Sequence, residues 1–102
     1  AMERGSEYAL AVSQNKPCVY ITFINNVTKD CDCLSDSEVI GEDIGIVAGL
    51  DPVAVDQAAY DLLKKHNGKD VFQDAGNPDG TRIIDYAEEL GVGSKDYELE
   101  EI

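Results

Sequence analysis

The order of apolar and polar positions predicts three strands. Residues 18–24 and 44–50 are almost continuously apolar and rich in β-branched side chains. Such runs are typical of strands that are buried on both faces. The segment 97–102 alternates between apolar and acidic residues, which predicts a third strand at an edge of the sheet.

Three further segments are predicted to be helical. Residues 2–14 favour a short helix, and Thr81 precedes an apolar stripe that ends before Gly91. The clearest helix start is Asp51-Pro52, an N-cap acid followed by proline at the first helical position, and Gly68 is placed to end that helix. We therefore expect an α/β fold with a small sheet of about three strands, two buried and one at an edge, covered by about three helices.

Two polar connections separate these elements. Residues 25–43 are acidic, and a connection of that length in a small domain is usually functional or disordered. Residues 69–80 end in the turn-rich run 76–80. The length of 102 residues, without a repeat or a linker, predicts one domain over residues 1–102.

The charge balance narrows the possible partners. The chain has 21 acidic and 8 basic residues, for a net charge of −13. This charge disfavours binding to nucleic acid and to anionic membranes, because both are negatively charged. The negative charge would attract a divalent cation or a basic protein. The alternative is that the acidic residues serve only to keep the protein soluble. The sequence has no apolar run of about 18–20 residues, and its three cysteines favour a reducing compartment. We expect a cytoplasmic protein.

The most distinctive chemical feature is the run Asp30-Cys31-Asp32-Cys33. Two thiols at i and i+2 can bind one soft metal ion, whereas a disulfide between them would be strained. The neighbouring carboxylates favour the neutral thiol, but a bound cation would stabilise the thiolates instead. Zinc needs four ligands, so others must come from elsewhere in this chain, a second chain or another part of the protein. The alternative is a pair of reduced cysteines in an ordered turn.

Five other residues are candidates for the same chemistry. Cys18 begins a predicted strand, where it can serve either as a small apolar side chain of the core or as a metal ligand. His66, the only histidine, lies in a last helical turn, where its charge suits the helix dipole. Asp43 and Asp51 stand on either side of the second strand and could share a cation with the cysteines. Asp51 also caps a helix, and Asp56 suits the dipole one turn further on.

Several ordered motifs resemble a known family. They are Cys31-Asp32-Cys33, Glu42–Ile46, Asp51–Ala58 and Tyr86–Ser94. Together they are similar to the C-terminal part of domain-of-unknown-function family 362, whose members are often labelled uncharacterised iron–sulfur centre proteins.

The resemblance implies a cofactor and a missing partner. Longer members carry a ferredoxin-like segment with four closely spaced cysteines, which this sequence lacks. We therefore expect a fragment or a truncated member of a longer iron–sulfur protein, with an iron–sulfur cluster or a divalent metal in the full-length context. The metal-binding candidates carried over are Cys31, Cys33, Asp43, Asp51 and Asp56.

Three functions remain open from the sequence. The first is an accessory, metal- or cluster-associated domain, related to electron transfer, whose partner is the ferredoxin-like domain or a redox protein. The second is a fragment of a metal-assisted enzyme in which Asp43, Asp51 and Asp56 line an acidic pocket. The third is a structural module whose apolar strands pair with the missing domain or with a second copy of the chain.

Overall fold

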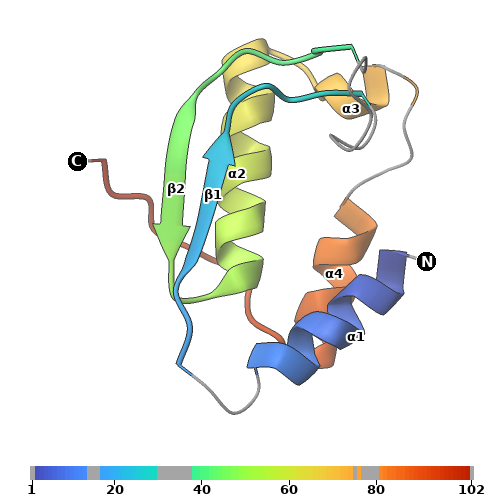
Figure 1. Cartoon of the computed structure of the whole chain (residues 1–102), viewed down its shortest axis with the longest axis vertical. Helices are drawn as coiled ribbons and strands as arrows, with labels where there is room; N and C mark the ends of the chain where they lie inside the picture. Colours follow the sequence, from blue (N-terminus) through green and yellow to red (C-terminus); the bar gives the residue numbers. More distant parts are fainter. Residues whose placement is uncertain (1, 14–16, 30–37, 75, 77–80, 102) are drawn as a thin grey trace.

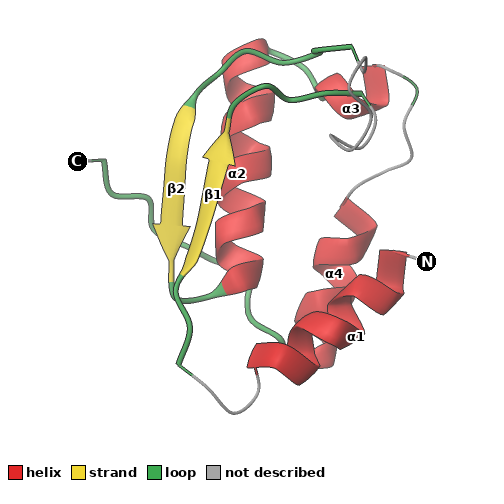
Figure 2. Cartoon of the chain, viewed as in Figure 1, coloured by secondary structure: helices red, strands yellow, loops and turns green. Residues whose placement is uncertain are grey.

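The computed structural model describes residues 2–13, 17–29, 38–74, 76 and 81–101. Four helices and two strands form the α/β fold that the sequence predicts (Figures 1 and 2). In chain order the elements are α1 (Met2–Ser13), β1 (Tyr20–Ile24), β2 (Gly45–Gly49), α2 (Pro52–Asn67), α3 (Val71–Asp74) and α4 (Thr81–Leu90).

The two strands form an antiparallel sheet that rests on α2. The register runs from Tyr20 opposite Gly49 to Ile24 opposite Gly45. Gly49 lets the strand approach α2 closely, because a Cβ at this position would lie 2.9 Å from Val55 Cγ2. The main core lies between the sheet, α2 and α3, and its buried residues are Ile24, Val47, Val55, Ala58, Leu63 and Val71.

Helices α1 and α4 lie side by side next to the start of α2 (Figure 1). A second, smaller core joins Val53 of α2 to Ile84 and Ala87 of α4. The buried Ser6 hydroxyl of α1 donates to the carbonyl oxygen of Ile83 at 3.0 Å, so that α1 leaves no unpaired hydroxyl in this contact.

Both predicted ends of α2 are confirmed. Asp51 Oδ1 accepts hydrogen bonds from the backbone N–H groups of Val53 at 2.9 Å and Ala54 at 3.3 Å. Gly68 ends the helix with φ of 70°, a left-handed conformation that costs glycine little. Asp51 Oδ2 also accepts from the N–H of Ser94 at 2.9 Å, so one carboxylate joins the start of α2 to the segment after α4.

The predicted third strand is not present, since residues 97–101 have no strand structure. Side-chain contacts tie this segment to helices instead. The Tyr97 hydroxyl donates to Asp61 Oδ2 of α2 at 2.7 Å, and Lys95 Nζ donates to Asp85 Oδ1 of α4 at 2.7 Å. Residues 97–101 are exposed, so water can pair with their backbone N–H and C=O groups without a neighbouring strand.

The prediction that both strands are buried on both faces is also wrong. Ile21, Phe23 and Ile46 point away from α2 and are 58%, 65% and 64% exposed. An apolar run in the sequence shows that a strand is hydrophobic. It does not show whether a second layer of helices or strands covers the other face of the sheet. In the connection 69–80, by contrast, the sequence did not predict the short helix α3.

Replacing Gly93 with alanine is expected to destabilise the chain. The added Cβ would overlap Asp51 Oδ1 and displace the carboxylate from its three N–H donors. Losing a helix N-cap costs about 1 kcal/mol, which corresponds to a fall of about 4–8 °C in melting temperature. Asp51→Asn should cost less, because asparagine retains one acceptor oxygen for the cap.

Thermal unfolding followed by circular dichroism measures these changes. The exposed Asp96 provides the control, and Asp96→Ala should melt within about 2 °C of the unsubstituted chain. An unchanged melting temperature for Gly93→Ala would show that the contact around Asp51 contributes nothing to stability.

Candidate functional site

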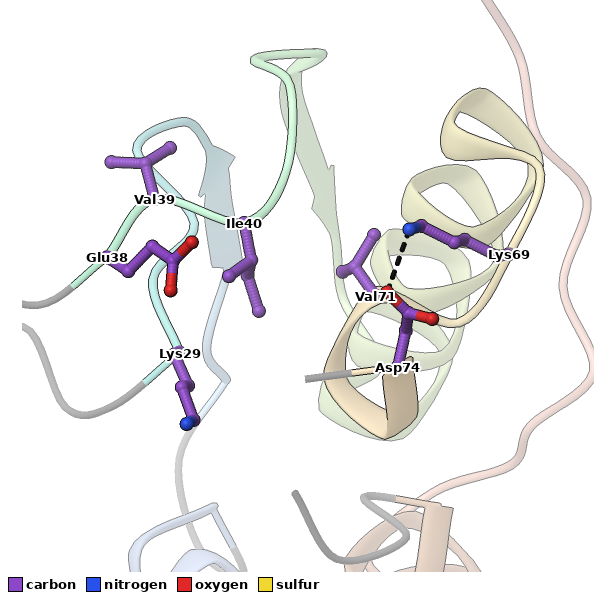
Figure 3. Close-up of a pocket in the computed structure, with 7 residues that line it drawn as sticks. All are labelled: Lys29, Glu38, Val39, Ile40, Lys69, Val71 and Asp74. Atoms are coloured by element: carbon purple, nitrogen blue, oxygen red, sulfur yellow. Dashed lines mark hydrogen bonds and ion pairs between the residues drawn. The ribbon is translucent and has the colours of Figure 1, made fainter. Parts of the chain in front are cut away.

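A cavity of about 390 Å³ lies between the connection that joins the two strands and α3 (Figure 3). Its volume falls within the usual range of ligand pockets, about 300–1,000 Å³. The lining residues are Lys29, Glu38, Val39, Ile40, Lys69, Val71 and Asp74.

One wall of the cavity is built by backbone pairing within the connection. The N–H of Ile40 donates to the carbonyl of Val27 at 2.8 Å, and the N–H of Lys29 donates to the carbonyl of Glu38 at 2.9 Å. Ile40 and Val27 also pack against the main core, which anchors the pairing. The positions on either side of residues 30–37 are thereby held together at the cavity rim.

The opposite wall is α3, which depends on Asp70. Asp70 Oδ1 accepts from the N–H groups of Phe72 and Gln73, both at 3.1 Å, and so caps the helix. The Tyr60 hydroxyl of α2 donates to the other oxygen of Asp70, and the Tyr60 ring stacks on Phe72 with centroids 6.4 Å apart. These contacts fix the buried Val71 as part of the cavity floor.

The cavity carries charges of both signs above an apolar floor. Lys29 and Glu38 come from the connection, whereas Lys69 and Asp74 come from the α3 side and form an ion pair with Nζ 2.8 Å from Oδ2 (Figure 3). Two of the eight basic residues of this acidic chain therefore line one cavity. The sequence did not predict this, because the two lysines are 40 positions apart and share no motif.

Cys31 and Cys33 lie outside the described residues, within 30–37. Their nearest described neighbours along the chain are Lys29 and Glu38, both on the cavity rim. Over the ranges that the structure describes, no three histidine, cysteine or acidic side chains gather closely enough to hold a metal ion.

The structure places Asp43 and Asp51 at opposite ends of β2. Asp43 Oδ1 accepts from the N–H of Asn26 at 2.8 Å, and Asn26 has a left-handed φ of 48°. Asp43 thus supports the turn after β1, and Asp51 caps α2. A five-residue strand spans roughly 16 Å. The two carboxylates are therefore not brought together around one ion.

Asp56 lies apart from both, at a second cleft of about 170 Å³ between α1, α2 and α4. Apolar residues such as Ala9, Val53 and Ala87 line this cleft. The carboxyl remains accessible to water on one side, while desolvation by the surrounding helices raises its pKa above the ordinary aspartate value.

The remaining two candidates also occupy separate places. Cys18 is half-buried just before β1 and is not in a disulfide. Burial and a side-chain hydrogen bond with Cys18 raise the pKa of Tyr20. His66 Nε2 lies 2.9 Å from Glu42 Oε2, and this exposed contact joins the end of α2 to the connection before β2.

The raised pKa of Asp56 gives stability a defined pH dependence. Folding favours the neutral carboxyl, so this contribution is present at low pH and is lost as pH rises through the folded-state pKa. Asp56→Asn should therefore raise the melting temperature at neutral pH, by about 1–3 °C, and the gain should shrink in acid.

A control is needed because removing any acid from a chain of net charge −13 lessens self-repulsion. Glu89→Gln on the exposed side of α4 measures that general effect. Melting curves of both variants at several pH values separate the two causes. Equal gains from Asp56→Asn and Glu89→Gln would mean that the cleft does not destabilise the charged carboxyl.

None of the helices in the described ranges is long and apolar enough to cross a membrane.

Residues 2–61 match the family described as "Domain of unknown function (DUF362)". Neither a curated protein nor a solved structure matches the chain. The matched region contains α1, both strands and most of α2, and it includes the connection with Cys31 and Cys33. It covers more than half of the chain and includes three of the four motifs that carry the resemblance, all except Tyr86–Ser94, and the chain therefore belongs to the DUF362 family.

Proposed function

We propose that the chain is an accessory domain of an iron–sulfur protein, in which Cys31 and Cys33 bind a metal ion or contact a cluster. The observation that carries this proposal is the backbone pairing of Lys29 with Glu38. The pairing anchors the two ends of a short connection to the core at the cavity rim. Cys31 and Cys33 lie in sequence between the paired positions and are separated by one residue, a spacing at which two thiols can bind one soft ion.

The composition of the connection supports a cationic ligand. Asp30, Asp32 and Asp36 surround the two cysteines in sequence, and carboxylates disfavour thiolates unless a positive ion is bound. A metal ion would neutralise thiolates and carboxylates together. The two sulfurs would provide part of the ligand set, and a ferredoxin-like domain or a redox partner protein would provide the rest.

The proposed role also sets the compartment. Thiolate ligands must stay reduced until the metal binds, and a reducing cytoplasm keeps them so. The cavity beside the connection, with Lys29 and Lys69 on its rim, offers the partner a place where both charged and apolar groups can be accommodated. This arrangement suits an accessory domain that docks beside a cluster.

Metal analysis of the anaerobically purified chain tests the proposal. We expect the chain to bind added Fe²⁺ or Zn²⁺ and to melt at a higher temperature with the metal, because an ion that binds only the folded state stabilises it. Cys31→Ser and Cys33→Ser should each weaken binding by about tenfold or more. Cys18→Ser is the matched control and should bind like the unsubstituted chain.

Two results would contradict the proposal. One is a chain that gains neither metal nor thermal stability under anaerobic conditions. The other is equal binding by all three serine variants, which would assign the affinity to carboxylates distributed over the acidic surface.

A further inference from the structure

The sheet has one apolar face that no described element covers. In the described ranges, the only helix in contact with β1 and β2 is α2, which packs on one side of them (Figure 1). On the opposite side, Phe23 faces Ile46 across the strands, and Ile21 faces Ala48. All four residues are exposed. A two-stranded sheet is marginal by itself, and an uncovered apolar face adds to this weakness.

The apolar face extends beyond the paired residues. Val19 and Leu50 are the next positions outward on the two strands, and they are 67% and 78% exposed. We call these six residues the open face: Val19, Ile21, Phe23, Ile46, Ala48 and Leu50. Their exposed area is on the order of 600 Å², at the upper end of the largest apolar patches on monomeric proteins.

The strands that form the open face carry no charge of their own. Residues 17–24 and 44–50 contain no charged side chain. Natural sheets usually protect a free strand with lysine, proline or an inward-pointing charge, and β1 and β2 contain none of these. The exposed side chains of the two strands can therefore contact another protein surface without burying a charge of their own.

We propose that a second copy of the chain covers the open face. Two such faces bury about 1,200 Å² in total, which reaches the lower limit of stable protein–protein interfaces. Stacked sheets pack about 10 Å apart, a spacing at which Phe23 and Ile46 of one copy fit between the same residues of the other. A two-fold axis through the centre of the open face gives each copy the same contacts.

Electrostatics gives this dimer a characteristic dependence on salt. Each copy has a net charge of −13, so the two repel at low ionic strength. The Debye length is about 8 Å at 0.15 M salt and about 3 Å at 1 M. Added salt therefore screens most of the repulsion between the two copies, whereas the apolar contact between them remains. The dimer should therefore tighten when salt is added. A partner with a basic surface would bind less tightly instead.

Sedimentation equilibrium of the full chain, in the presence of a chelator, tests the proposal without any role for metal. We expect a reversible dimer whose dissociation constant falls at least about threefold between about 0.05 and about 0.5 M NaCl. Phe23→Ser and Ile46→Ser should each raise that constant by about tenfold or more, because large central side chains dominate interface energies.

Val12→Ser is the matched control, since Val12 is about as exposed, at 71%, and belongs to α1 and not to the six residues of the open face. It should dimerise like the unsubstituted chain, and circular dichroism should show the same fold for all three variants. A monomer at every salt and protein concentration would overturn the proposal. A dimer that survives both open-face substitutions, or that weakens with salt, would overturn it as well.

Discussion

The packing of α2 against one face of the β1–β2 sheet is the contact on which the rest of the structure depends. A pair of strands does not persist in water without an apolar layer beside it. Val55, Ala58 and Leu63 provide that layer, and Gly49 permits the close approach. The same helix reaches the second core through Val53. Every other element is attached to α2 directly or through one intermediate.

Local signals in the sequence were sufficient for the three longer helices, α1, α2 and α4, but not for the short helix α3. Asp51, Pro52 and Gly68 define the ends of α2 through hydrogen bonds and backbone angles that depend on near neighbours. The burial of the strands could not be predicted in the same way, because it depends on which other elements pack on the sheet. An apolar strand has the same composition whether a second layer covers it or not, which is why Phe23 was predicted to be buried. Tyr97 lies in an alternating segment, yet its hydroxyl donates to Asp61 of α2 and residues 97–101 are not in a strand.

The candidate site was less predictable than the fold. Acidic residues that are close in sequence, such as Asp43 and Asp51, are separated by the length of a strand and serve the backbone around them. Lys29 and Lys69 are distant in sequence and meet at one cavity. The family match confirms what the motif around Cys31 and Cys33 indicated about kinship. Their proposed chemistry still depends on residues beyond the described ranges.

The helix pair formed by α1 and α4 has a consequence for where this folding unit ends. The family match stops at residue 61, but α4 and Ser94 lie beyond it. Without them, α1 would lose the helix it packs on, and one oxygen of Asp51 would lose its donor. The matched region therefore ends inside a packed unit, and the part of the chain that folds together continues past residue 61 through α4 to Ser94.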